Sequence, residues 1–227
     1  MMIRPIPPMN HFRERLREVL QYEMRHTGAF IVRKHLNVYA SGDHDEMVYL
    51  IEDGKITQRM LSYGGKQCLL AIYTTGELFG ELCLVENGER KETATAMEDT
   101  ILKSIPCAHF LLRLRQTSLL EEFIRYLAMR IADQQQAIAN FVTMGSEQRL
   151  GKTLLQLAKK FSQKDPCHLC IRQKISHEEL SEMVGTTRPR ISQFMRRFRE
   201  LGLIEMTKEH HLLIKEEPLR SYLANGD

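Results

Sequence analysis

The spacing of hydrophobic and polar positions changes along the chain. Residues 10–26 carry apolar residues at helical intervals, which predicts a short amphipathic helix. From about residue 28 to 105, short apolar runs alternate with glycine-containing turns such as EDGK and YGGK. Runs of this length predict several antiparallel strands in a barrel or sandwich. Gly54 and the pair Gly64-Gly65 are expected in tight hairpin turns, where a positive φ favours glycine.

After Pro106 the helical pattern returns, and its longest segment ends at Gly145. Apolar residues recur there at alternating steps of four and three, the heptad spacing of helices that pair along their lengths. The row consists of Leu120, Ile124, Leu127, Ile131, Ile138 and Phe141, interrupted by Gln134. A core helix lying on its own domain is the alternative, but more than three heptads favour a dimerisation helix. Gln134 and the adjacent Gln135 either fix the register or meet a polar group.

These patterns divide the chain into three segments. Residues 1–117 are expected to form a strand-rich domain with an N-terminal helix, and residues 118–145 the dimerisation helix. Residues 146–227 are expected to form a helical domain that ends in two short strands, LIEMTK and HHLLIK. The stretch SQKDPCHLC within this last domain is interpreted as a loop.

Charge distinguishes the last of these segments. Residues 1–145 carry a net charge of −1 and residues 146–227 a net charge of +4, so the basic excess lies where a polyanion would bind. Ser176 and Glu179 form a capping box at the start of one helix, and Gly185 ends it. Pro189 fits the first turn of the next helix, which is rich in arginine. Helix, short turn, basic helix and strand pair together predict a winged helix-turn-helix.

The second helix of this motif is expected to read DNA. Arginine can bind guanine and glutamine can bind adenine through paired hydrogen bonds. Residues early in the helix are placed to reach bases, and the later arginines to hold phosphates. The predicted DNA-binding residues are Thr186, Thr187, Arg188, Pro189, Arg190, Gln193, Arg196, Arg197 and His177. A solvated basic face on a structural helix is the alternative, which the agreement of charge, capping, turn and wing disfavours.

Composition narrows the class of protein further. Five scattered cysteines are an odd number and argue against a secreted disulfide framework. We find neither a signal peptide nor a membrane-spanning segment, so a cytoplasmic protein without a membrane partner is expected. The sequence has no nucleophile–base constellation, no P-loop and no H-E-x-x-H motif, so an enzyme is not expected.

Two stretches carry a family resemblance. ISHEELSEMVGTTRPRISQFMRRFRELGLIE resembles the DNA-binding domain of the cyclic AMP receptor protein/FNR (CRP/FNR) family of bacterial transcription factors. GELFGELCLVENGERKETATA, followed by the long helix, is similar to the sensor domain and dimer helix of that family. The resemblance implies an α+β fold: an N-terminal cyclic-nucleotide-binding-type β-roll (a jelly roll), a central dimerisation helix and a C-terminal winged helix-turn-helix. It also implies a homodimer that binds a palindromic double-stranded DNA operator and contacts RNA polymerase.

The resemblance also assigns base contacts. The family's base-reading positions fall on Arg188, Pro189 and Gln193, where the cyclic AMP receptor has Arg, Glu and Arg. Only the first is kept, so the half-site should share the guanine read by Arg188. It should differ where Pro189 and Gln193 stand; at Pro189 the side chain has no donor or acceptor for a base.

An effector site follows from the same resemblance. In members that bind cyclic AMP, a Gly-Glu pair meets phosphate and ribose, an Arg followed by Ser or Thr grips the phosphate, and a Thr-Ser pair on the dimer helix meets the purine. The corresponding residues are Gly80, Glu81, Leu82, Arg90, Lys91, Gln134 and Gln135. Lys91 replaces the hydroxyl residue and the glutamines replace the Thr-Ser pair. Cyclic AMP, another small-molecule effector and no effector therefore all stay open.

The side chains of Glu81 and Arg90 distinguish these alternatives. In a sensor they should face an open pocket, whereas in a scaffold they should pair with each other or with neighbouring side chains. The leading hypothesis is a dimeric regulator whose operator affinity is controlled by an effector bound between the β-roll and the dimer helix. The alternative is an effector-independent regulator with a scaffold β-roll.

A cysteine-based sensor is less favoured. The N-terminal cysteine run that binds an iron–sulfur cluster in FNR-type members is missing. Cys167 and Cys170 form a lone C-x-x-C, with too few partners for a structural zinc site. We therefore expect no metal site and no resident cofactor, and a thiol or metal redox sensor at Cys167 and Cys170 stays a minor alternative.

Overall fold

The computed structural model describes residues 9–23, 28–85, 88–161, 169–172, 174–209 and 211–225. The chain forms two compact units, Met1–Asp133 and Gln134–Asp227. The division falls within the long helix α3 (Leu120–Thr143), so the segment expected for dimerisation contributes to both units.

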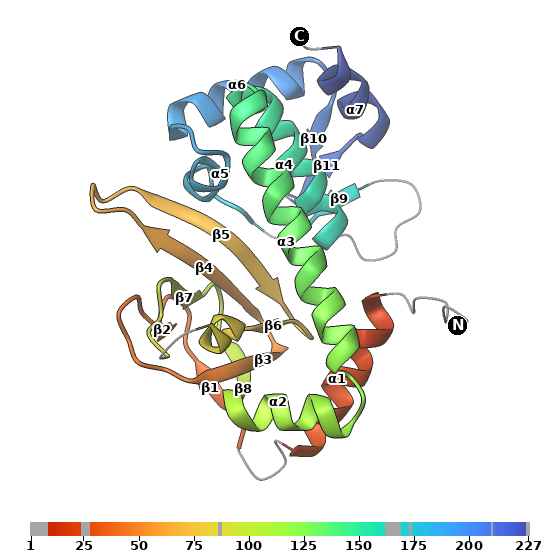
Figure 1. Cartoon of the computed structure of the whole chain (residues 1–227). Helices are drawn as coiled ribbons and strands as arrows, with labels where there is room; N and C mark the ends of the chain where they lie inside the picture. Colours follow the sequence, from red (N-terminus) through yellow and green to blue (C-terminus); the bar gives the residue numbers. More distant parts are fainter. Residues whose placement is uncertain are drawn as a thin grey trace. The chain divides into compact units, whose positions relative to one another are not determined.

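Unit 1 is a β-roll with helices at its N-terminal and C-terminal ends (Figure 1). Its strands pair antiparallel in two four-stranded sheets of order β1-β8-β3-β6 and β2-β7-β4-β5, as the predicted jelly roll requires. Before the first half of α3, its elements are α1 (Met9–Glu23), β1 (Phe30–Val32), β2 (Asn37–Tyr39), β3 (Met47–Asp53), β4 (Lys55–Leu61), β5 (Gln67–Thr74), β6 (Leu78–Phe79), the 3-10 helix η1 (Glu81–Leu84), β7 (Thr93–Ala96), β8 (Thr100–Pro106) and α2 (Cys107–Gln116).

The two predicted glycine turns have different outcomes. Gly64 and Gly65 lie between β4 and β5, which pair with each other, so this hairpin is confirmed. Gly54 lies between β3 and β4, which belong to different sheets, so the prediction of a hairpin there is wrong. Gly54 has φ +104°, and an added Cβ would lie 2.5 Å from Oγ1 of Thr100. Glycine is therefore required because the chain passes close to β8 as it changes sheet.

Strand β3 is buried on both faces. Tyr49 and Ile51 belong to the core between the two sheets, whereas Val48 and Leu50 belong to a second core under the helices. Alternate side chains of a strand point to opposite faces, so burial on both sides produces the uninterrupted apolar run VYLI.

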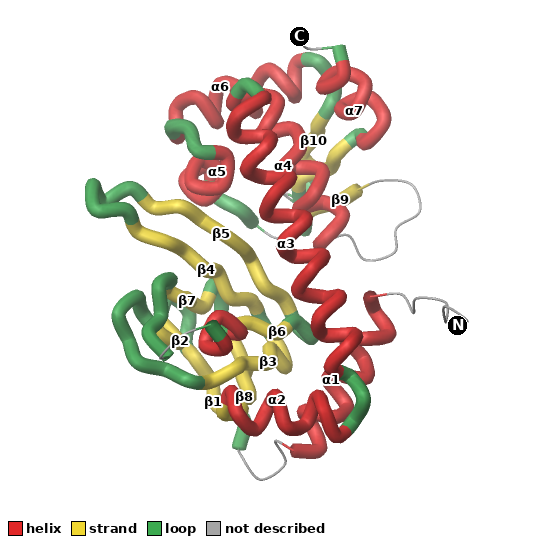
Figure 2. The backbone as a smooth tube through the Cα atoms, in the orientation of Figure 1, coloured by secondary structure: helices red, strands yellow, loops and turns green. Residues whose placement is uncertain are grey.

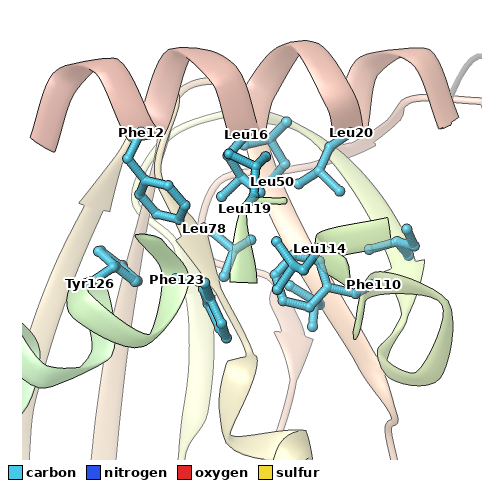
Figure 3. Close-up of a cluster of buried hydrophobic side chains, with 12 residues drawn as sticks. Phe12, Leu16, Leu20, Leu50, Leu78, Phe110, Leu114, Leu119, Phe123 and Tyr126 are labelled. Atoms are coloured by element: carbon cyan, nitrogen blue, oxygen red, sulfur yellow. The ribbon is translucent and has the colours of Figure 1, made fainter. Parts of the chain in front are cut away.

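The second core joins α1, α2 and the start of α3 to this sheet. In Figure 3, Phe12, Leu16 and Leu20 point from one face of α1 toward aromatic and aliphatic side chains of the other elements. Phe110 of α2 and Phe123 of α3 meet edge to face, with ring centroids 5.2 Å apart. The first turns of α3 are therefore fixed to the β-roll by apolar burial.

Unit 2 carries helices around a small sheet, as the secondary-structure colours of Figure 2 show. After the end of α3 its elements are α4 (Ser146–Phe161), β9 (Leu169–Ile171), α5 (His177–Val184), α6 (Arg188–Glu200), β10 (Ile204–Met206), β11 (Leu212–Ile214) and α7 (Glu216–Ala224). The antiparallel pair β10–β11 is the predicted wing. Sequence analysis missed α7 and also β9, which pairs with β11 from a segment interpreted as a loop.

Within unit 2 the turn between α5 and α6 packs against the end of α3. Gly185 has φ +68°, and an added Cβ would lie 2.6 Å from Cε1 of Phe141. Gly202 has nearly the same φ, +67°, with no atom within 4 Å of that position. Both glycines adopt the left-handed backbone conformation, but only Gly185 also leaves room for a neighbouring ring, that of Phe141.

We expect Gly202→Ala to lower the free energy of unfolding by about 1 kcal/mol, the cost of a left-handed backbone for alanine. Gly185→Ala should lower it by about 1–3 kcal/mol more, because the methyl group overpacks against Phe141. Urea unfolding of the full chain, followed by circular dichroism, measures both. Equal losses in the two variants would contradict the packing of the turn against Phe141.

Candidate nucleic-acid interface and effector site

The helix-turn-helix is built from local signals. The Ser176 hydroxyl accepts a hydrogen bond from the Glu179 amide at 3.1 Å, and the Glu179 carboxylate accepts one from the Ser176 amide at 2.8 Å. Gly185 ends α5 in the left-handed conformation, and Pro189 lies in the first turn of α6. The predicted capping box, turn glycine and N-terminal proline are all confirmed.

Helix α6 has one apolar and one basic face. Ile191, Met195 and Phe198 are buried, and Phe194 is partly buried. The opposite face exposes most of the predicted DNA-binding residues, namely Thr187, Arg188, Pro189, Arg190, Gln193, Arg196 and Arg197; Thr186 and His177 are partly exposed. The structure therefore brings the predicted set together on one accessible surface.

The arginines of this surface differ in their partners. Arg197 lies 3.3 Å from a carboxylate oxygen of Glu147, and the other oxygen of that carboxylate accepts a hydrogen bond from Tyr222 at 2.8 Å. Among the described residues, no ion pair holds Arg188, Arg190 or Arg196. These three guanidinium groups are consequently the ones free to meet an external anion.

His177 connects α5 to α6. Its Nδ1 lies 2.8 Å from the Ser192 hydroxyl, which donates to the backbone carbonyl of Arg188 at 3.1 Å. Burial and the positive charges of Arg188 and Arg199 lower the pKa of His177 below its usual value. The lowered pKa favours the neutral imidazole at neutral pH. Its hydrogen-bond partner is Ser192 of the recognition helix α6.

Sequence analysis missed Arg149, which joins the end of α3 to the helix-turn-helix. Its guanidinium donates to the carbonyl oxygens of Met144 at 2.7 Å, Val184 at 2.9 Å and Gly185 at 3.4 Å. It also lies 4.9 Å from the ring centroid of Phe141. One side chain thus donates to carbonyl oxygens at the ends of two helices, where backbone acceptors have no partner within the helix.

In the predicted effector region, Arg90 is almost fully buried at 2% exposure. It donates to the carbonyl oxygen of Gly80 at 2.6 Å and to that of Met47, and it pairs with Asp45 at 3.1 Å. Its guanidinium carbon lies 4.2 Å from the ring centroid of Tyr39. The side chain expected to grip a phosphate is thus bound by acceptors from its own β-roll.

Glu81 is also paired within unit 1. Arg130 of α3 forms an ion pair with one oxygen of Glu81 and donates to the Tyr73 hydroxyl at 2.5 Å. Burial disfavours the charge of Arg130, but Tyr73 and Glu81 outweigh burial and raise its pKa. The Glu81–Arg130 contact spans 49 residues of sequence, so no local pattern predicted it.

A polar network continues from Arg130 into the β-roll interior. The Tyr73 hydroxyl donates to the Gln58 side chain at 3.0 Å, and Gln58 donates to Glu92 at 3.0 Å. Glu92 also accepts from the Tyr39 hydroxyl at 3.1 Å. Glu81 and Glu92 each keep one buried carboxylate oxygen that has no hydrogen-bond partner among the described residues. These two oxygens are acceptors that a ligand with donor groups would stabilise.

The remaining predicted effector residues face solvent. Lys91 pairs with Glu89 at 3.2 Å and its side chain is 64% exposed, so it points away from the buried Arg90. Leu82, Gln134 and Gln135 are exposed. The structure therefore brings Gly80, Glu81 and Arg90 together in unit 1, whereas Gln134 and Gln135 belong to unit 2.

The described ranges also bear on membrane insertion and metal binding. No helix there is long and apolar enough to cross a membrane. No group of three or more His, Cys, Asp or Glu side chains there is arranged to hold a metal ion. Cys167 lies outside the described residues, and Cys170 is a half-buried thiol in β9.

Both units match the models of known domain families. Residues 31–117 match the model of the cyclic nucleotide-binding domain, and residues 148–222 match that of the Crp-like helix-turn-helix domain. The chain is 26% identical over 185 residues to the CRP-like cAMP-activated global transcriptional regulator of Mycobacterium tuberculosis, covering 80% of this chain and 82% of that protein. It is 28% identical over 172 residues to the cyclic AMP receptor protein of Thermus thermophilus, covering 74% and 76% respectively.

A solved structure supports the same fold. A CooA variant from Carboxydothermus hydrogenoformans aligns with a TM-score of 0.73 at 22% identity, covering 86% of this chain and 87% of that one. The relatives are named as transcription regulators, not as enzymes. An effector-binding β-roll followed by a DNA-binding helix-turn-helix, in this order and with these relatives, shows that the chain belongs to the CRP/FNR family of transcription regulators.

Proposed function

We propose that the chain is a homodimeric, sequence-specific regulator that binds a palindromic DNA operator through α6 and responds to a small-molecule effector at the β-roll. The observation that carries the DNA part is the exposed face of α6, where three arginines have no ion-pair partner among the described residues. Such a face suits the major groove, where arginine can bind guanine edges and phosphates. RNA polymerase is the protein partner that membership of the family implies, and binding to bacterial DNA implies a cytoplasmic location.

The dimer part rests on the predicted seam of α3. Ile124, Ile131 and Ile138 are 57%, 54% and 64% exposed, and Phe141 is 44% exposed. Leu120 and Leu127 are only partly exposed, because they also pack against the helical core of unit 1. A row of large apolar side chains on a long helix favours a partner that removes it from water, and a second copy has the matching row.

Replacing Ile138 by Glu should weaken the dimer about 100-fold or more, because two apolar side chains leave the seam and two like charges enter it. Ala132→Glu is the matched control, since it puts the same charge on exposed α3 outside the seam. Sedimentation equilibrium over a range of concentrations measures both. Unchanged association in Ile138→Glu, or equal loss in both variants, would exclude this seam.

The DNA part can be tested once the preferred site has been selected from random DNA. Arg188→Ala should cost about 1–3 kcal/mol at that site and relax preference at one base pair. Arg196→Ala should weaken binding to specific and random DNA alike. It should also reduce the slope of log affinity against log salt concentration by about one. Fluorescence anisotropy at several salt concentrations separates the two effects. Equal losses on both DNAs for both variants would overturn the assignment of reader and anchor.

The effector part is supported by the cyclic nucleotide-binding domain and by the names of the relatives. A cyclic nucleotide would meet Glu81 through its ribose hydroxyl and Arg90 through its phosphate, the roles that the family assigns to these positions. Both side chains already have protein partners, so an effector has to compete with Arg130 and with the acceptors of Arg90. That competition would connect effector binding to α3, which carries Arg130 and continues into unit 2.

A second candidate function is an effector-independent regulator with a scaffold β-roll. The buried pairs Arg90–Asp45 and Glu81–Arg130 favour it, because a scaffold is expected to pair these side chains internally. DNA binding is common to both candidates.

Calorimetric titration of cyclic AMP into protein freed of nucleotide distinguishes them. We expect saturable binding at one site per subunit, weakened about 10–100-fold in Glu81→Gln because a charged acceptor is lost. Lys91→Ala should change affinity little, since its amine is exposed and pairs with Glu89. The absence of saturable heat in the parent protein would favour the effector-independent candidate, or an effector of another chemical class, and would leave the DNA assignment intact.

A further inference from the structure

One arginine of the exposed face of α6 is already paired within unit 2. Arg197 lies two helical turns after Arg190, so both side chains project from the same side of the recognition helix. The Arg197 guanidinium lies 3.3 Å from a carboxylate oxygen of Glu147, yet its side chain is 59% exposed and open to an external anion. Carboxylate and phosphate bind guanidinium in similar ways. An internal carboxylate therefore occupies a group that is placed to bind a DNA phosphate.

Two features hold the Glu147 carboxylate in place. The Tyr222 hydroxyl donates a hydrogen bond to its other oxygen at 2.8 Å. Burial and this hydrogen bond raise the pKa of Tyr222, so the hydroxyl keeps its proton at neutral pH. Glu147 also lies in the first turn of α4, where free backbone amides stabilise a negative charge. The carboxylate is consequently the anchored member of the pair, and the Arg197 guanidinium is the member that can turn toward another anion.

Tyr222 is positioned by the packing of α7 in unit 2. Helix α4 contacts both α6 and α7, and Leu219 of α7 is fully buried. The Tyr222 ring meets the Phe198 ring of α6 edge to face, with centroids 5.8 Å apart. At Gly151 of α4 an added Cβ would lie 2.6 Å from Cδ2 of Leu223, so glycine lets α7 approach closely. Tertiary packing therefore fixes the place of the Tyr222 hydroxyl.

We propose that Glu147, held by Tyr222, is an internal competitor of DNA phosphate for Arg197. In the free protein the carboxylate pairs with the guanidinium. When DNA binds, a phosphate replaces the carboxylate, and the cost of breaking the pair lowers the affinity for DNA of any sequence. Glu147 thus sets the strength of DNA binding without contacting a base. This inference rests on the proposed DNA binding through α6, but on neither the operator, the dimer nor the effector.

The exposure of the pair determines the size of the effect. An ion pair with an exposed arginine changes an equilibrium constant by about two- to fivefold. Phosphate can therefore displace the carboxylate, and the competitor adjusts affinity without abolishing binding. Salt screens exposed charges, so the effect should be largest at low ionic strength.

A double-mutant cycle on random-sequence DNA tests the competition. Fluorescence anisotropy at low ionic strength measures the affinities of the parent, Glu147→Gln, Arg197→Ala and the double variant. Loss of a carboxylate near DNA raises affinity by itself, but that gain does not depend on Arg197. We expect Arg197→Ala to weaken binding about two- to fivefold more in the Glu147→Gln protein than in the parent, where breaking the pair offsets part of the phosphate contact. Equal losses in the two backgrounds would overturn the proposal.

Tyr222→Phe tests the role of the hydroxyl while keeping the ring that packs on Phe198. This variant should raise the affinity of the parent for DNA by less than Glu147→Gln does. It should leave the affinity of the Glu147→Gln protein unchanged, because the hydroxyl acts only through the carboxylate. No gain in the parent, or an equal gain in both backgrounds, would overturn the role given to Tyr222.

The matched control is Glu178→Gln, which removes an exposed carboxylate from α5. Its effect on affinity should be the same with and without Arg197. A coupling as large as that of Glu147→Gln would mean that net charge, not the pair, is responsible, and would overturn the proposal. A parent protein that binds no DNA would overturn the proposed function and this inference with it, whereas additive losses on DNA that the parent binds overturn this inference alone.

Discussion

The sheet β1-β8-β3-β6 buries apolar side chains on both faces, and the candidate sites of unit 1 depend on this arrangement. One face closes the β-roll interior with Tyr49 and Ile51, and the other receives α1, α2 and α3 on Val48 and Leu50. The same strand therefore holds the sheets together and fixes the start of α3. Arg130, one turn beyond Tyr126 on that helix, is thereby brought to Glu81.

Burial of charge sets the chemistry of the β-roll. A buried guanidinium is stable only when acceptors surround it, and Arg90 has the carbonyls of Gly80 and Met47 together with Asp45. Arg130 similarly compensates Glu81, and Gln58 and Tyr39 compensate part of Glu92. Glu81 and Glu92 each have one carboxylate oxygen without a described partner, whereas the guanidinium of Arg90 is already engaged. The interior therefore has more acceptors than a phosphate site needs. For this reason the effector proposal requires a ligand to compete with existing partners.

In unit 2 the turn of the helix-turn-helix depends on residues outside the motif. Arg149 binds the carbonyls of Val184 and Gly185, and it lies over Phe141, whose ring occupies the space that a side chain at residue 185 would need. The end of α3 and the turn between α5 and α6 are consequently held through one small cluster. In a dimer formed along α3, this cluster would transmit a change in the seam to the recognition helix.

Features that arise from neighbouring residues could be predicted from the sequence alone. Ser176 with Glu179, Gly185 and Pro189 predicted the helix-turn-helix, because capping and turn geometry act within a few positions. The order of helix and strand patterns, together with the family resemblance, predicted the β-roll, the long helix and the wing. Which distant groups meet could be seen only in the folded chain: Arg90 with Asp45, Arg130 with Glu81, and Arg149 with Val184. The tertiary structure likewise decided that β9 pairs with β11, since a short strand forms only where a partner offers free hydrogen-bonding groups. Such contacts depend on how whole elements pack, and no local spacing of residues encodes them.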